Sequence, residues 1–145
     1  MLKSALVSKA HLLELPEGRE EALRAAVGSL AAEVGLDEEE VFAAVMEREK
    51  VMATGMGHGV AIPHAKIKGI DDFKIAICKS SHPIEYESMD SVPVRILVLL
   101  LSPEERVRDH VKIIAEISKK LKFSVVRQGI LDAKTPQEME KAFLN

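Results

Sequence analysis

With 145 residues, 47% of them hydrophobic, the chain has the length of one domain and enough apolar side chains to bury a core. A formal charge of −3 and an aromatic content of 3% argue against nucleic-acid binding, which needs a basic surface and stacking side chains. The single cysteine excludes an internal disulfide or a cysteine zinc cluster, and without a leader peptide or a long apolar run we expect a cytoplasmic protein.

The first half of the chain is predicted to be mainly helical. After a short extended segment at 11–15, apolar residues recur every three or four positions over 17–35, as on the buried face of a helix. Asp37 and Glu40 have the spacing of a capping box, which marks the start of a second helix. This helix runs towards Arg48, whose positive charge suits the C-terminal end of a helix.

Two strands are predicted in the second half. Residues 73–78 have the apolar content and alternation of a strand, and the single cysteine at their end is expected to be a small buried hydrophobe. A polar loop with a short strand at 84–86 is expected over 80–92. Residues 94–101 are apolar at all positions but one, which predicts a central strand buried on both faces.

Helices are predicted to close the chain. Ser102 and Pro103 match an N-cap followed by proline at the first helical position, so a long helix is predicted to start there. Two shorter helices are predicted at 124–131 and 136–143. This order of elements predicts an α/β fold, a single-domain sandwich over residues 1–145 in which helices cover a mixed β-sheet.

The segment 48–66 combines features that restrict its backbone. Glycines at every second position permit conformations that other residues avoid, and they are Gly55, Gly57 and Gly59. Pro63 fixes its own φ angle and favours extended geometry at the residue before it. We therefore expect a tightly turning loop that presents His64 on or beside a strand in one orientation.

His64 is the first candidate for chemistry. A neutral imidazole is nucleophilic near neutral pH and can carry a transferred group covalently. If that group is phosphoryl, the protein mainly has to position it and balance its charge. The Arg48 guanidinium, the Thr54 hydroxyl and loop amides around Gly59 are suitable donors. The alternative is a histidine packed at the base of the loop that only donates one hydrogen bond.

His110 is the second candidate. On the predicted helix it faces the sheet together with an apolar stripe made of Val107, Ile114, Ile117 and Leu121. It is then either a hydrogen-bonded core histidine or a group that meets His64 inside the protein.

Other kinds of site agree less well with the sequence. The positions of His58, His64 and His110 match no common zinc spacing, so no metal is expected. The glycine-rich segment lacks the Gly-Lys-Ser/Thr ending of a nucleotide-binding P-loop. His11 and His82 are expected at the surface.

Several motifs together resemble a known family. They are Arg48-Glu49, Thr54-Gly55-Met56-Gly57, Gly59-Val60-Ala61-Ile62-Pro63-His64-Ala65-Lys66, Met89-Asp90, Val92-Pro93-Val94, Ser102-Pro103-Glu104 and His110. The combination extends over nearly the whole chain. It is similar to the fructose/mannitol-type (type 2) A domain of enzyme II in the bacterial phosphoenolpyruvate-dependent sugar phosphotransferase system, a domain that nitrogen-regulatory phosphocarriers share.

The resemblance implies a phosphocarrier. His64 would accept a phosphoryl group from the small phosphocarrier HPr and pass it to a IIB domain, through which a membrane IIC complex could be contacted during sugar uptake. Arg48 would neutralise the phosphoryl group, and His110 would orient His64 or stabilise its charged state. The family has a mixed sheet between helices and uses no metal and no organic cofactor.

Two further interpretations stay open beside sugar transport. A regulatory protein of the same type, which binds partners according to its phosphorylation, would carry the same motif. A domain that has lost transfer activity is disfavoured because Arg48, His64 and His110 are all present. Two positions depart from the family pattern: His58 replaces the Asn or small polar residue often found between the glycines, and Val111 replaces a common Leu.

Overall fold

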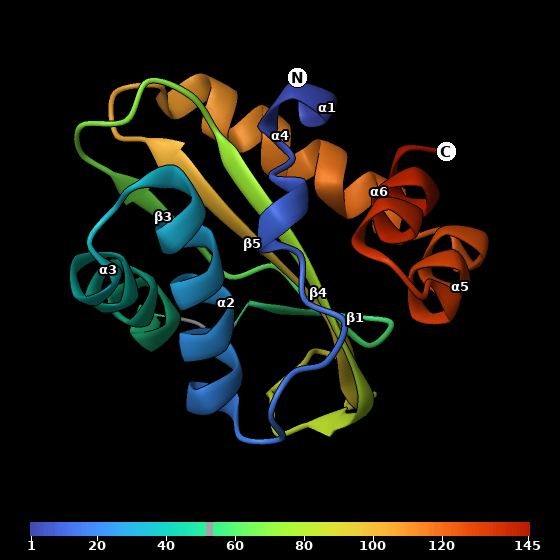
Figure 1. The fold of residues 1–145 in the computed structure, drawn as a ribbon. Coiled ribbons are helices and arrows are strands. Elements are labelled where there is room, and N and C mark those ends of the chain that lie inside the picture. Colours follow the sequence, from blue (N-terminus) through green and yellow to red (C-terminus); the bar gives the residue numbers. More distant parts are fainter. Residues whose placement is uncertain (52–53) are drawn as a thin grey trace.

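Residues 1–51 and 54–145 are described in a computed structural model of the protein (Figure 1). Met52 and Ala53, which belong to the predicted loop over 48–66, lie outside the described residues. In chain order the elements are α1 (Leu2–Ala5), the 3₁₀ helix η1 (Ser8–Ala10), α2 (Arg19–Val34), α3 (Glu38–Val51), β1 (Gly55–Gly57), β2 (Val60–Ala61), β3 (His64–Ile67), β4 (Lys74–Ile84), β5 (Val94–Pro103), α4 (Val107–Leu121), α5 (Ser124–Asp132) and α6 (Pro136–Leu144).

Strand β5 lies in the middle of a mixed sheet. It pairs with β4 in antiparallel orientation along one edge and with β2 and β3 in parallel orientation along the other. Val60 of β2 is opposite Ile96 of β5. His64 of β3 is opposite Leu100. Both residues lie four positions after the Val60–Ile96 pair, so β2 and β3 pair with β5 in one continuous register. Pro63 interrupts that line because it has no N–H for the ladder, although its carbonyl accepts from Leu100 N at 3.0 Å.

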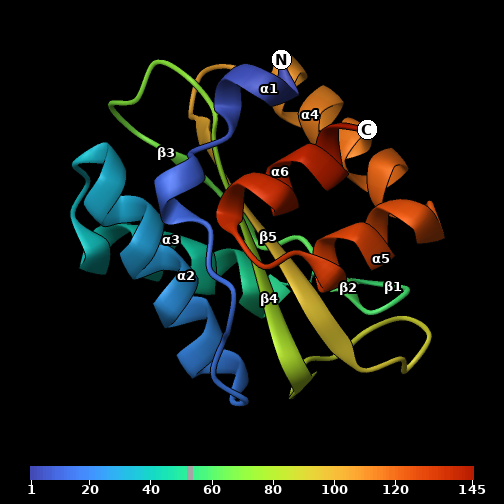
Figure 2. The same cartoon turned by 45° about the vertical axis from the view of Figure 1, so that its right-hand side comes forward.

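Helices cover both faces of this sheet (Figures 1 and 2). Helices α2 and α3 pack on one face, and α4, α5 and α6 pack on the other. Successive side chains of β5 enter these two cores in turn, with Leu97 and Leu99 on the first side and Ile96 and Val98 on the second. None of the four is more than 1% exposed. The strand is therefore buried on both faces, as predicted, and the predicted α/β fold class is confirmed.

The helix predicted from Ser102 is wrong at its start. Strand β5 continues to Pro103, and α4 begins at Val107. Ser102 and Pro103 pair with Lys66 and Ile67 of β3, so the ladder of backbone hydrogen bonds takes precedence over the local N-cap pattern. Ser102 is left inside the protein at 0% exposure rather than at a helix end.

The apolar stripe predicted on this helix is also partly wrong. Val107, the first residue of α4, is 52% exposed. The side chains of α4 that are buried are His110, Ile113, Ile117 and Leu121. His110 therefore does face the interior, but with Ile113 beside it where the prediction had Ile114.

The predicted surface position of His11 is wrong. Its side chain is buried, with Nδ1 accepting from Ile77 N at 3.0 Å and Nε2 lying 3.2 Å from Glu140 Oε1. These partners belong to β4 and α6, which are distant in sequence, so no local pattern reports them. Burial lowers the pKa of His11, and the Glu140 carboxylate only partly offsets that effect.

The cap predicted for the second helix is confirmed, and it can be tested. Asp37 Oδ1 accepts from Glu40 N at 3.0 Å at the start of α3. The Asp37→Ala variant should lower the free energy of unfolding by about 1 kcal/mol, because the first turn of α3 loses this acceptor. Urea denaturation would measure the change. Asp71→Ala is a matched control at an exposed carboxylate outside any helix and should change the value by less than about 0.5 kcal/mol. Equal effects in the two variants would contradict a capping role.

Candidate functional site

His64 is held by its own chain in one orientation. It is the first residue of β3, is 9% exposed, and its Nδ1 lies 2.8 Å from the carbonyl oxygen of Ile62. A carbonyl oxygen only accepts hydrogen bonds, so Nδ1 carries the proton in this contact. Nε2 is then the nitrogen with a free lone pair. The Ile-Pro-His step thus provides both the place of the ring and its tautomer.

His110 reaches the site from a different element, α4. The ring centroids of His110 and His64 are 5.4 Å apart, and the ring planes are inclined by 60°. His110 Nδ1 lies 2.6 Å from the hydroxyl of Ser102 on β5. The contact between the two histidines, which sequence reasoning considered as one of two alternatives, is present in the structure.

The surroundings of both imidazoles favour the neutral form of the ring. Burial lowers the pKa of His64, the hydrogen bond to Ile62 acts in the opposite direction, and the charge of Arg48 lowers it further. Burial also lowers the pKa of His110, to about 4, and His64, Lys66 and Arg48 add to the effect. A neutral ring with an unprotonated Nε2 is the nucleophilic form of histidine.

The two histidines line the same pocket. The pocket has a volume of about 260 Å³ and is lined by Ala44, Arg48, His64, Ala65, Lys66 and His110. Arg48 lies in the last turn of α3, and Lys66 projects from β3. Two cations beside a neutral nucleophile suit a transferred group of high negative charge, such as phosphoryl.

Thr54 and Gly59 are not among the residues that line this pocket. The Thr54 hydroxyl contacts the Glu49 carboxylate and lies 2.9 Å from the Tyr86 hydroxyl. Gly59 lies in the turn between β1 and β2 and lines a separate pocket. The structure therefore brings Arg48, His64 and His110 together, and it places the other two proposed phosphate-binding residues elsewhere.

Glu49 belongs to the Arg48-Glu49 motif of the sequence, to which no separate role was assigned. Its side chain is 1% exposed, and its carboxylate accepts from Arg19 at 3.0 Å and from the Tyr86 hydroxyl at 2.6 Å. The Thr54 N–H and hydroxyl bind the same carboxylate, so Glu49 ties α3 to the segment that enters β1. An acidic side chain in the last turn of a helix opposes the helix dipole, and that signal could have drawn attention to it.

The turn between β1 and β2 is built from His58 and Gly59. Both have positive φ angles, 57° and 77°, which a type I′ hairpin turn requires at its two central residues. The Asp90 carboxylate accepts from His58 N at 2.9 Å and holds the turn from outside. His58 thus lies on a rigid turn and does not line the pocket of His64 and His110.

Neither a metal site nor a membrane span is found in residues 1–51 and 54–145. No group of three or more His, Cys, Asp or Glu residues could hold a metal ion there. No helix in these ranges combines the length and the apolar content that crossing a membrane requires.

Comparison with known proteins decides the family. Residues 9–145 match the family model described as "Phosphoenolpyruvate-dependent sugar phosphotransferase system, EIIA 2". The chain belongs to this EIIA type 2 family. The resemblance seen in the sequence motifs is thereby confirmed, and members of the family are components of a phosphotransferase system.

Similar proteins in the family are named either as nitrogen regulatory proteins or as sugar-specific EIIA components. A nitrogen regulatory protein of Bradyrhizobium diazoefficiens is 36% identical over 104 residues, which are 72% of this chain and 68% of that protein. A fructose-specific EIIA component of Haloferax volcanii is 31% identical over 130 residues, which are 88% and 84% of the two chains. The crystal structure of the nitrogen regulatory protein IIA-Ntr of Neisseria meningitidis covers 98% of both chains with a TM-score of 0.90 at 24% identity, which supports the EIIA fold alone.

Proposed function

We propose that this EIIA protein is a phosphocarrier whose acceptor atom is Nε2 of His64. The hydrogen bond from Nδ1 to the Ile62 carbonyl carries the proposal, because it leaves Nε2 as the nitrogen with a free lone pair. Nε2 would attack the phosphorus of a phosphohistidine donor such as phospho-HPr. A new N–P bond forms as the N–P bond of the donor breaks, and the donor histidine leaves with the electron pair of that bond.

Arg48, Lys66 and His110 would act on the charge of the phosphoryl group. The two cations lie on the wall of the same pocket and can balance its oxygens. We assign the Ser102 hydroxyl as the donor to His110 Nδ1, which places the proton of His110 on Nε2. This N–H can then donate to a phosphoryl oxygen, and the negative charge of that group raises the pKa of His110.

The test is the mass of the intact protein after incubation with phosphoenolpyruvate, enzyme I and HPr. The mass should rise by one phosphoryl group, and brief acid treatment should remove it, as expected for phosphohistidine. A parallel reaction with a known acceptor would establish that enzyme I and HPr are active. If the mass of this protein does not rise although the known acceptor is phosphorylated, the proposal is wrong.

Two roles are consistent with this chemistry. Transfer to a sugar-specific IIB domain is supported by the fructose-specific EIIA relative, and a regulatory role through phosphorylation-dependent binding is supported by the nitrogen regulatory relative. Loss of the label on addition of a IIB domain and its sugar would favour transport. Regulation would be favoured if the phosphoryl group stays on the protein in the presence of IIB and if phosphorylation changes the affinity of the protein for a regulatory partner.

His110→Ala should slow phosphoryl transfer roughly a hundredfold, the usual cost of removing one donor to the charge that develops in the transition state. Rapid-quench measurement of the transfer rate from phospho-HPr would test it. Val111→Ala is the matched control, because Val111 is the next residue of α4 and is 63% exposed. If the two variants transfer at the same rate, His110 is a core histidine without a role in the reaction.

A further inference from the structure

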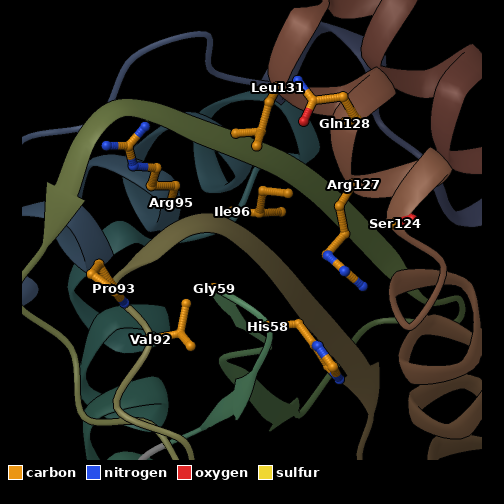
Figure 3. A pocket seen from close by; sticks show the side chains of 10 residues that line it. All are labelled: His58, Gly59, Val92, Pro93, Arg95, Ile96, Ser124, Arg127, Gln128 and Leu131. Carbon is orange, nitrogen blue, oxygen red and sulfur yellow. The ribbon is translucent and has the colours of Figure 1, made fainter.

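A second pocket lies on the other half of the sheet and carries three basic side chains. It has a volume of about 370 Å³, and its basic lining residues are His58, Arg95 and Arg127. Figure 3 shows that they come from different parts of the chain: His58 from the β1–β2 turn, Arg95 from β5 and Arg127 from α5. Apolar side chains, including Ile96 and Leu131, line the same pocket and can contact a non-polar part of a ligand.

The backbone brings Arg95 and Ile96 to the same pocket. The carbonyl oxygen of Gly59 accepts from Arg95 N at 2.9 Å and from Ile96 N at 3.1 Å. Two residues of β5 thus stand opposite one residue of the neighbouring segment, which is the arrangement of a β-bulge. Regular alternation would send these side chains to opposite faces, so the bulge explains why both line the pocket.

In the part of the chain that the structure describes, the basic side chains of this pocket form no ion pair with a carboxylate. Within residues 1–51 and 54–145, Arg95 makes no hydrogen bond or ion pair through its guanidinium, and the His58 ring makes none either. Arg127 Nη1 donates to the backbone carbonyls of Leu121 and Lys122, and to no carboxylate in the same ranges. Arg127 and His58 lie close to each other in Figure 3, and the Arg95 guanidinium extends away from them at another end of the pocket. The cavity is therefore lined by two guanidinium groups that have no carboxylate partner in the described residues.

Carboxylates near the pocket are already engaged. The Asp90 carboxylate accepts from His58 N and from Val92 N at 3.0 Å, and Asp132 accepts from Gln128 Nε2 at 2.9 Å. Neither aspartate is among the residues that line the pocket. Neither carboxylate pairs with Arg95 or Arg127, so both guanidinium groups can pair with a negative group supplied from outside.

We propose that this pocket binds a small organic phosphate monoester. Guanidinium groups bind phosphate oxygens in forked geometry, and the apolar wall accommodates the organic part. The first residue of α5, Ser124, also lines the pocket, so the positive end of this helix dipole adds to the attraction.

This pocket is distant from the one at His64. Ile96 lines this pocket, and Leu100 is the residue of β5 that lies opposite His64. The two are four residues apart on β5, which is roughly 13 Å of strand. The site is therefore separate from the one at His64, and its test does not depend on phosphoryl transfer.

The experiment is a titration followed by two-dimensional ¹H–¹⁵N NMR. The probes are adenosine 5′-monophosphate, glucose 6-phosphate and inorganic phosphate, with adenosine and glucose as uncharged counterparts. The phosphate monoesters should shift the amide signals of Gly59, Arg95, Ile96 and Ser124, and the uncharged compounds should not. Stronger binding of the monoesters than of inorganic phosphate is expected, because the organic part packs on the apolar wall.

Variants separate this site from general attraction of anions. Arg95→Gln should weaken binding of the best monoester by about tenfold or more, since one charge-assisted contact is lost. His58→Asn should weaken it as well, and Asn tolerates the positive φ at this position. Arg108→Gln removes the same charge at an exposed position on α4 and should leave affinity unchanged.

Three outcomes would overturn the proposal. They are absence of binding at millimolar monoester, equal affinity in Arg95→Gln and Arg108→Gln, and shifts confined to the amides around His64 and His110. The last outcome would show that the monoester binds at the phosphoryl-transfer pocket instead.

Discussion

Replacing His64 by Gln should abolish acceptance of the phosphoryl group. The amide nitrogen of Gln has no free lone pair, because its electrons are delocalised into the carbonyl group, whereas Nε2 of His64 has one. After incubation with phosphoenolpyruvate, enzyme I and HPr, the variant should keep its unmodified mass. Its melting temperature would be measured beside that of the wild type to establish that the fold is retained.

His82→Gln is the matched control for this loss. The His82 ring lies 3.0 Å from the Ser80 hydroxyl and does not line the pocket of His64 and His110. This variant should acquire one phosphoryl group like the wild type. Full labelling of His64→Gln would show that another residue is the acceptor.

The site of attachment within the ring provides a sharper test. ³¹P–¹H correlation spectra of the phosphorylated wild type distinguish the two ring nitrogens. We expect phosphorus on Nε2, because Nδ1 donates its proton to the Ile62 carbonyl. Phosphorus on Nδ1 would require that this hydrogen bond is broken, and the proposed role of the Ile-Pro-His step would then be wrong.

Replacing Glu49 by Ala should lower the free energy of unfolding by about 3 kcal/mol. The carboxylate is buried, and its removal leaves the Tyr86 hydroxyl and the Arg19 guanidinium without this acceptor. Loss of one partner of a buried charge pair costs roughly 3–5 kcal/mol. The lower end of that range is expected, because the Arg19 side chain is 35% exposed and can be hydrated. Urea denaturation followed by circular dichroism would measure the change.

Glu47→Ala is the matched control on the same helix. Glu47 is 74% exposed and pairs with Lys50 at 3.1 Å, and exposed pairs of this kind contribute less than about 1 kcal/mol. A much smaller loss is therefore expected than for Glu49→Ala. If the two variants lose similar amounts of unfolding free energy, the hydrogen bonds around Glu49 do not stabilise the fold more than an exposed ion pair does.

Local signals in the sequence were sufficient for several elements of the fold. Asp37 caps α3 through Glu40 N, as its spacing predicted, because a cap depends on atoms three residues apart. Thr135 caps α6 in the same way, with its side chain accepting from Glu138 N at 3.1 Å. The apolar run of β5 correctly predicted a strand buried on both faces, since burial on two faces leaves no polar alternation.

The same local signals failed where distant segments compete for a residue. Ser102 has the sequence context of an N-cap, but pairing with β3 keeps it in the sheet, and its hydroxyl contacts His110. His11 has no apolar periodicity around it, and it is buried because β4 and α6 supply its partners. Neither outcome can be obtained from spacing along the chain, because the partners lie on other elements.

The sequence by itself indicated the family through its motifs, and it predicted the central strand and the Ile-Pro-His step that presents His64. Glycine, proline and cap residues act through the backbone of their own neighbourhood, so their effects can be predicted without the rest of the fold. The tertiary structure alone decided that His64 meets His110 at 5.4 Å and that Glu49 ties α3 to the segment entering β1. It also decided that Arg95 and Arg127 line a cavity without an acidic partner in the described residues. These contacts depend on the strand register and on which helices cover which face of the sheet.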